Sequence, residues 1–195
     1  MTPPRPCARR TTLADVIPDI ETLASREIYR NAWMRVREDD IRRRDGSTGI
    51  YGVVEKTDFV TVVALHADGS VQLVQQFRYP VGLRQWEFVQ GMWGPPGTDP
   101  LEAARHELLE ETGLAASDWQ HGGRLNLAQG SMTQAYDIFV ARGLTQGAAM
   151  PEVEEQDIVT RAVPLAELEA MLRDGTILDA TTMATFGLLR LKGLM

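Results

Sequence analysis

Cysteine is nearly absent from this sequence, which has only Cys7 among its 195 residues. A single thiol excludes an internal disulfide framework and a zinc site built from several cysteines. Long apolar runs are absent too, and none approaches the roughly 20 residues that a membrane-spanning helix needs. Residues 1–11 lack the apolar centre of a signal peptide. We therefore expect a cytoplasmic protein without a membrane partner, with a flexible tail at residues 1–12.

The sequence also has no excess of positive charge. It contains 20 Lys and Arg residues against 27 Asp and Glu residues, which gives a formal net charge of -7. Because nucleic-acid-binding proteins are normally basic, this charge argues against a nucleic-acid partner and against an anionic membrane surface. The hydrophobic fraction of 44% is ordinary for a globular protein. The length suits one domain, or one domain with a small addition.

A small antiparallel β unit is predicted for residues 13–56. Strand-forming residues cluster near 24–29, 33–43 and 50–55, with a turn sequence at Asp45–Gly49 between the last two. The charge run Arg37–Arg44 has mixed sign and lies beside this turn, which favours a solvated hairpin over a phosphate- or nucleic-acid-binding patch. A unit this short is marginal alone, so we expect it to pack on the main domain or on a partner subunit.

The main domain is expected to cover residues 57–195 and to alternate strands with helices. The order of elements argues for an α+β or α/β sandwich. Strands are predicted at 59–66, 71–78, 86–89, 118–128, 135–141 and 158–163, and helices at 100–112, from Pro164-Leu165 to near Gly175, and at about 180–191.

The helix at 100–112 has clear start and stop signals. Asp99 can cap the first amides, Pro100 suits the first helical position, and Gly113 supplies a left-handed stop. Glu102 is expected to close a capping box with Asp99.

One stripe of this helix carries only carboxylates. Glu107, Glu110 and Glu111 lie three or four residues apart, and no Lys or Arg on the helix is placed to compensate them. Like charges at this spacing cost about 0.2–0.5 kcal/mol per pair. Such a cluster suits a divalent cation such as Mg²⁺ or Mn²⁺, whose ligands are oxygens. A solvated acidic face is the competing interpretation, and the helix alone does not separate the two.

The segment Glu107–Leu114 resembles the core of the Nudix box, G-x5-E-x7-R-E-U-x-E-E-x-G-U, where U is a bulky aliphatic residue. Further segments are similar to ADP-ribose and nucleotide-sugar pyrophosphatases, so that the resemblance covers roughly residues 50–191. It implies an α+β Nudix fold, an α/β/α sandwich with a mixed sheet, preceded by a small antiparallel unit that makes a homodimer. The similar segments are Leu73–Pro80, Trp86–Gly91, Glu154–Ile158, Val163–Leu165 and Gly175–Leu189.

The resemblance assigns roles to the glutamates. Glu107 and Glu111 match the main ligands for Mg²⁺ or Mn²⁺ and so take part in catalysis, Glu110 matches an assisting ligand, and the backbone carbonyl of Gln90 completes the site. The general base of the family often comes from a loop after the box, where Glu154 matches it. Glu152 and Glu155 are close enough in sequence to be confused with Glu154.

Four further residues are candidates for substrate binding. Arg78 matches an arginine that touches phosphate in the family, although arginines at strand ends are often simply solvated. Glu87 precedes the box loop, where it can contact substrate or metal or make a structural hydrogen bond. Trp86 and Trp93 flank the same loop and can stack on a base or a sugar, but tryptophans beside a strand are more often in the core.

The leading glycine of the box falls on Met92, with Gly91 adjacent, and the box departs from its pattern at two further positions. Thr98 stands where the pattern has a glutamate, and His106 stands where it has an arginine. Because His106 lies one turn before Glu110, we expect it either to orient that carboxylate or to have no role.

The chemistry implied is hydrolysis of a diphosphate linkage. The leading substrate is ADP-ribose, cleaved to AMP and ribose 5-phosphate, followed by GDP- or ADP-sugars. The N-terminal unit and the late acidic loop disfavour a nucleoside-triphosphate hydrolase. The altered box positions leave open a second interpretation, a Nudix-like sensor that binds a nucleotide without hydrolysing it.

Overall fold

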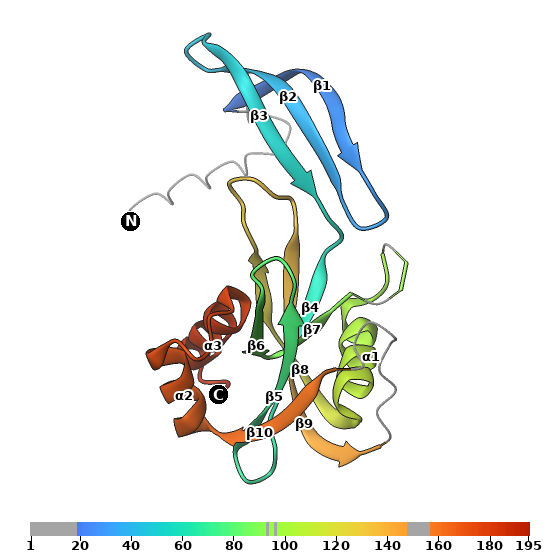
Figure 1. The fold of residues 1–195 in the computed structure, drawn as a ribbon, viewed down its shortest axis with the longest axis vertical. Helices are drawn as coiled ribbons and strands as arrows, with labels where there is room; N and C mark the ends of the chain where they lie inside the picture. The colour runs from blue at the N-terminus through green and yellow to red at the C-terminus, as the bar shows by residue number, and fades with distance from the viewer. Residues whose placement is uncertain (1–18, 93, 96, 148–156) are drawn as a thin grey trace, which may run out of the picture. The chain divides into compact units, whose positions relative to one another are not determined.

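The computed structural model describes residues 19–92, 94–95, 97–147 and 157–195 (Figure 1). The chain divides into two compact units, one ending at Val54 and the other beginning at Glu55. Each unit has its own sheet structure. Within the described ranges, no helix has the length and apolar character needed to cross a membrane.

The first unit is one sheet of three strands in the order β1-β2-β3. Strand β1 (Ile20–Arg30) runs antiparallel to β2 (Arg35–Arg43), and β3 (Thr48–Glu55) follows the turn predicted at Asp45–Gly49. Asp45 stabilises this turn because its carboxylate accepts a hydrogen bond from Ser47 N at 2.9 Å. The predicted antiparallel unit is therefore present.

The charges of this sheet pair with one another across its strands. Arg42 of the predicted hairpin contacts Glu21 at 3.1 Å, and Arg35 contacts Glu27 at 2.9 Å. Arg26 and Glu38 form a further cross-strand pair. Since the arginines are satisfied by carboxylates at the surface, the structure agrees with a solvated hairpin.

The second unit contains two sheets. The first has the order β7-β4-β9-β8, and the second has the order β10-β5-β6. Strands β4 and β9 are parallel, and the other described pairs are antiparallel, so that the larger sheet is mixed as predicted. The strands are β4 (Phe59–Ala64), β5 (Ser70–Arg78), β6 (Leu83–Glu87), β7 (Val89–Gly91), β8 (Leu114–Asn126), β9 (Ala135–Gln146) and β10 (Val159–Pro164).

Three helices cover these sheets. Helix α1 (Pro100–Thr112) packs on the mixed sheet, while α2 (Leu165–Asp174) and α3 (Ala180–Lys192) lie on the opposite side (Figure 1). Side chains of β4 alternate between two cores: Val60 and Val62 pack with residues of α1, whereas Val63 packs with residues of α2 and α3. The predicted α+β sandwich is confirmed, with β4 buried on both faces.

The hairpin of β8 and β9 is longer than the sequence indicates. Strand β8 begins at Leu114 rather than near 118, and β9 continues to Gln146 rather than ending near 141. The register shifts between His121 and Gly123, and such a bulge interrupts the two-residue alternation by which strands are recognised. The polar, partly exposed ends of these strands therefore carry little sequence signal.

Candidate active site

Helix α1 has the predicted ends. The Asp99 carboxylate accepts a hydrogen bond from Leu101 N at 3.0 Å, and Gly113 adopts a left-handed conformation with φ of 71°. The predicted capping box is wrong, because Glu102 instead pairs with Arg105 at 2.6 Å. An arginine three residues along the same helix face is within easy reach of this carboxylate.

The three glutamates of the carboxylate stripe are buried. Glu107, Glu110 and Glu111 are only 5%, 7% and 3% exposed. The interpretation as a solvated acidic face is therefore wrong. Burying carboxylates in one cluster costs free energy unless a positive charge compensates them. The position thus suits a cation.

Gly91 brings the end of β7 directly against this cluster. A Cβ atom at position 91 would lie 2.2 Å from Oε2 and 2.8 Å from Oε1 of Glu107, far inside contact distance. Only glycine permits this approach. Consequently the Glu107 carboxylate lies beside the backbone directly after Gln90. The family resemblance assigns the Gln90 carbonyl to the metal site.

This arrangement fits a magnesium-like ion with few side-chain ligands. Within the ranges described, no three His, Cys, Asp or Glu side chains converge closely enough to hold an ion by themselves. Mg²⁺ commonly takes only one or two carboxylates and completes its shell with waters and substrate phosphates. Glu107, Glu111 and the Gln90 carbonyl are oxygen donors of the right kind for such a site.

His106 contacts Glu110. Its Nδ1 atom lies 2.8 Å from Oε2 of Glu110. This is the contact that an orienting role of His106 requires, and the role itself stays a prediction. Thr98, the other altered position, donates its hydroxyl to the carbonyl of Pro95 at 2.7 Å. Thr98 thus holds the loop before α1 and supplies no carboxylate.

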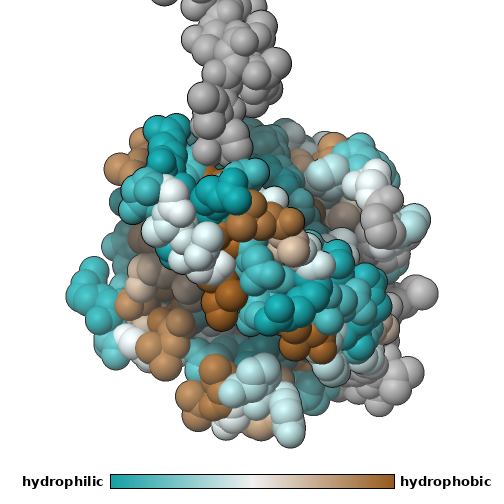
Figure 2. All heavy atoms as spheres, turned by 90° about the horizontal axis from the view of Figure 1, so that it is seen from above, coloured by the Kyte–Doolittle hydropathy of each residue, from teal (hydrophilic) through white to brown (hydrophobic). Residues whose placement is uncertain are grey.

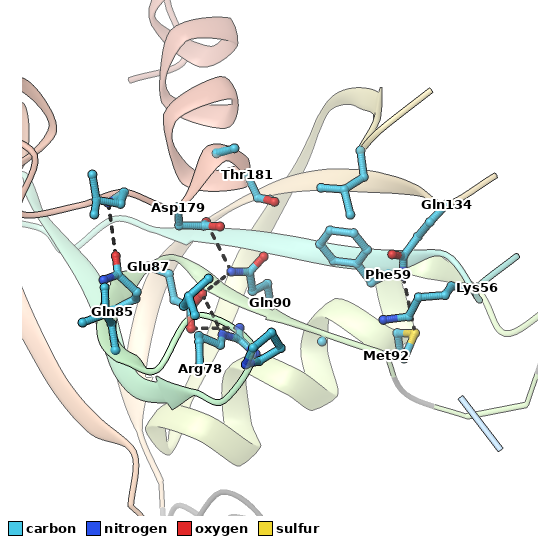
Figure 3. Close-up of a pocket in the computed structure, with 17 residues that line it drawn as sticks. Lys56, Phe59, Arg78, Gln85, Glu87, Gln90, Met92, Gln134, Asp179 and Thr181 are labelled. Atoms are coloured by element: carbon cyan, nitrogen blue, oxygen red, sulfur yellow. Dashed lines mark hydrogen bonds and ion pairs between the residues drawn. The ribbon is translucent and has the colours of Figure 1, made fainter. Parts of the chain in front are cut away.

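A cavity of about 540 Å³ lies on the α3 side of β7. Figure 3 shows two ends: Arg78, Glu87 and Gln85 at one, and Lys56, Phe59, Met92 and Gln134 at the other, with Gln90 and Asp179 between them. Gly91 lines this cavity, whereas the lining formed by described residues does not include the α1 glutamates. Strand β7 therefore separates the carboxylate stripe from the cavity, and Gly91 touches both.

A hydrogen-bond network crosses the middle of the cavity. Arg78 Nη2 lies 2.8 Å from Glu87 Oε1, and Gln90 Nε2 donates to Glu87 Oε2 at 2.5 Å and to Asp179 Oδ2 at 3.3 Å. Burial raises the pKa of the Glu87 carboxyl above its ordinary value, and the Arg78 guanidinium opposes this rise. Glu87 is 1% exposed, so its charge depends on Arg78.

Asp179 ties this network to helix α3. As the N-cap residue it accepts hydrogen bonds from the backbone nitrogen of Thr182 at 2.8 Å and from its hydroxyl at 2.7 Å. The Thr182 hydroxyl in turn accepts from Phe88 N at 3.0 Å. The N-terminus of α3 thereby fixes the β6–β7 connection.

The predicted site residues fall into four groups. Arg78, Glu87 and Gln90 line the cavity, and the α1 glutamates lie across β7 from it. Trp86 packs against the core formed with α2 and α3 and is not part of the described cavity lining. Glu154 and Trp93 lie outside the described residues, as do Glu152 and Glu155.

Sequence reasoning missed several lining residues. Asp179 had a signal, because an aspartate directly before a predicted helix is a typical N-cap. Lys56, Phe59 and Gln134 had none, since they lie between or at the ends of predicted strands and meet only in the fold.

The fold and this site together define a class of protein: an α/β/α sandwich that presents clustered box glutamates beside a glycine at a strand end. Two family models match the chain. Residues 56–186 match the NUDIX domain, and residues 20–54 match the nucleoside diphosphate sugar hydrolase N-terminal domain. The chain belongs to the NUDIX family and is a Nudix pyrophosphohydrolase.

Two curated relatives have similar sequences over most of their length. The chain is 32% identical to an ADP-ribose pyrophosphatase of Mycobacterium tuberculosis over 168 residues, which cover 85% of this chain and 81% of that protein. It is 29% identical to a GDP-mannose pyrophosphatase of Pectobacterium atrosepticum over 157 residues, covering 74% and 79%.

A solved structure shares the fold. The crystal structure of an ADP compounds hydrolase superposes with a TM-score of 0.79 at 23% identity, covering 92% of this chain and 98% of that one. The predicted Nudix fold with its N-terminal antiparallel unit is confirmed.

Proposed function

We propose that this enzyme hydrolyses the diphosphate linkage of ADP-ribose, giving AMP and ribose 5-phosphate, with Mg²⁺ or Mn²⁺ as cofactor. The observation that carries the proposal is the burial of Glu107, Glu110 and Glu111, with the Glu107 carboxylate beside Gly91. A GDP-sugar is the second candidate. The curated relatives named after ADP-ribose and GDP-mannose support this substrate class.

In this proposal the reaction takes place at the end of β7. Glu107 and Glu111 would hold the cation there with the Gln90 carbonyl, and Glu110, oriented by His106, would add negative charge next to them. When bound, the cation neutralises the diphosphate charge and activates a water. Because Gly91 lines the cavity and touches Glu107, a diphosphate beside Gly91 would leave its two organic groups in the cavity.

Arg78 and Glu154 have the remaining proposed roles. Glu87 engages Nε and Nη2 of Arg78, which leaves Nη1 of this half-exposed side chain for a phosphate oxygen. Glu87 acts by holding the guanidinium in place. Glu154 is proposed to take the proton of the attacking water, as a base must from within hydrogen-bond reach.

We also propose a cytoplasmic homodimer built through the N-terminal unit. Its sheet exposes large apolar side chains, among them Ile28, Trp33 and Ile50 at 56%, 64% and 63%. Apolar surface of this kind supports an interface. Figure 2 shows hydrophobic and hydrophilic residues interspersed over the face that it draws.

The test is hydrolysis of a panel of ADP-ribose, ADP- and GDP-sugars, dinucleotides and nucleoside triphosphates with Mg²⁺ or Mn²⁺. We expect metal-dependent cleavage of one diphosphate class that Glu111→Gln reduces by at least about 100-fold. Glu102→Gln on the same helix, an exposed residue paired with Arg105, is the matched control and should leave the rate unchanged. Metal-independent binding of one nucleotide without turnover of any compound would contradict the proposal and indicate a sensor.

A further inference from the structure

The side chain of Gln90, as distinct from its backbone carbonyl, lies in the middle of the cavity. Its Nε2 atom donates to Glu87 Oε2 at 2.5 Å and to Asp179 Oδ2 at 3.3 Å (Figure 3). One amide group therefore bridges two carboxylates that come from different elements, the end of β6 and the residue before α3.

This bridge fixes which way the amide points. Glu87 faces the Arg78 guanidinium, and Asp179 accepts hydrogen bonds from Thr182. Both carboxylates are therefore acceptors, and only the NH₂ group of the amide can satisfy them. The reversed orientation would place Oε1 of Gln90 against two carboxylate oxygens.

The orientation leaves Oε1 of Gln90 as an acceptor that no described residue uses. Among the described residues, none donates a hydrogen bond to it, whereas the Nε2 atom of the same amide donates two. The two hydrogen bonds that Nε2 donates hold the amide group rigidly. Its Oε1 atom can therefore accept a hydrogen bond from a donor at little entropic cost.

We propose that Gln90 Oε1 is a specificity-determining group that accepts a hydrogen bond from a sugar hydroxyl of the substrate. The proposal rests on the function proposed above. The chemistry of the amide selects the kind of group: Oε1 is an acceptor, and an anionic phosphate oxygen has no proton to donate to it. A hydroxyl group can donate, and it is neutral beside the carboxyl groups of Glu87 and Asp179.

The position along β7 selects which part of the substrate is read. Gln90 directly precedes Gly91, where the diphosphate is proposed to lie, so that the Gln90 side chain begins next to the diphosphate. The substrate group next to the diphosphate is the sugar attached to it. A nucleobase lies one ribose further away.

The experiment combines a side-chain deletion with deletions of single hydroxyls. Binding of ADP-ribose, and of analogues that each lack one ribose hydroxyl, is measured by titration calorimetry in EDTA with the wild type and Gln90→Ala. The wild type should bind the analogue that lacks the recognised hydroxyl about 10-fold more weakly than ADP-ribose, which corresponds to about one hydrogen bond. Gln90→Ala should bind ADP-ribose about 10-fold more weakly and show no further loss with that analogue.

Gln85→Ala is the matched control. Gln85 lines the same cavity, but its Oε1 atom already accepts a hydrogen bond from Leu178 N at 3.2 Å. This variant should keep the full loss on removal of the hydroxyl. Gln90→Met, which keeps the side-chain volume, should behave as Gln90→Ala does and guards against misfolding, which a melting curve of each variant checks.

The outcomes separate the two proposals. Equal losses for every analogue in the wild type and in Gln90→Ala, or no binding of any of these compounds, would overturn the role of Oε1. Coupling to one hydroxyl without metal-dependent hydrolysis of ADP-ribose would support the acceptor and overturn the proposed function. Hydrolysis without any such coupling would do the reverse.

Discussion

Helix α1 and the sheet formed by β1 and β2 both concentrate carboxylates, but they place them in opposite surroundings. In the sheet, Glu21, Glu27 and Glu38 face arginines on neighbouring strands near the surface. In the helix, Glu107, Glu110 and Glu111 are all buried, and they lie within five consecutive residues. Exposed pairs contribute little to stability, whereas moving several carboxylates out of water costs free energy. Such a cluster therefore points to function rather than to stability.

The largest expected effect comes from making the same substitution in both regions. Glu107→Gln should lower hydrolysis by at least about 100-fold, because it removes a ligand of the proposed cation. Glu38→Gln should leave activity unchanged and alter stability by less than about 1 kcal/mol.

Activity assays and urea denaturation with and without Mg²⁺ would measure both effects. Added Mg²⁺ should stabilise the wild type and Glu38→Gln but not Glu107→Gln, since a ligand stabilises only the form that binds it. If Glu107→Gln kept both its activity and its response to Mg²⁺, the difference drawn between helix and sheet would fail.

A second pair of variants tests how closely each region is packed. An added methyl at Gly91 would meet the Glu107 carboxylate at 2.2 Å, whereas one at Gly52 of β3 would have no atom within 4 Å. Neither glycine has a positive φ, so the methyl group alone makes the difference. Gly91→Ala should destabilise the protein by about 1–3 kcal/mol and impair hydrolysis, while Gly52→Ala should stay within about 0.5 kcal/mol.

Denaturant unfolding and the hydrolysis rate of both variants provide the measurement. Full activity in Gly91→Ala would mean that the Glu107 carboxylate can move away from β7 without consequence. The proposed position of the cation beside Gly91 would then be untenable.

Local signals explain what the sequence predicted well. Asp99 and Gly113 act on neighbouring backbone groups, so the ends of α1 follow from residues within one turn. The spacing of Glu107, Glu110 and Glu111 likewise placed them on one stripe. The capping box failed at the same local level, because Arg105 competes for Glu102.

Contacts over long sequence separations explain what the sequence did not show. Gln90 and Asp179 are 89 residues apart, and their hydrogen bond depends on where α3 packs against β7. The burial of the glutamate stripe also depends on the sheet beneath α1, which is why the helix alone left metal and solvent equally open. Trp86 gave the same ambiguity between stacking and packing, and in the fold it lies against the core.

The smallest expected effect is the pH dependence of stability that one carboxylate of each unit contributes, Glu87 in one unit and Glu27 in the other. Burial raises the pKa of Glu87 above its ordinary value of 4.5, whereas the hydrogen bond from Arg30 lowers the pKa of Glu27 below 4.5. For Glu87, the unfolded chain loses its proton at lower pH than the folded chain does. Its contribution to stability is therefore complete below pH 4.5 and falls as pH rises through the folded pKa. The contribution of Glu27 is present above pH 4.5 and falls as pH drops through its folded pKa.

Urea denaturation of the wild type, Glu87→Gln and Glu27→Gln from about pH 3.5 to about pH 7 would show these opposite signs. The stability of the wild type relative to Glu87→Gln should decrease with rising pH, and its stability relative to Glu27→Gln should increase. The difference between the wild type and each variant removes the contribution of the other titrating groups, because both proteins share them. If the two differences changed in the same direction, Glu87 would be held in its charged form by Arg78 as effectively as Glu27 is by Arg30. Burial in the cavity would then not distinguish the carboxylates of the two units.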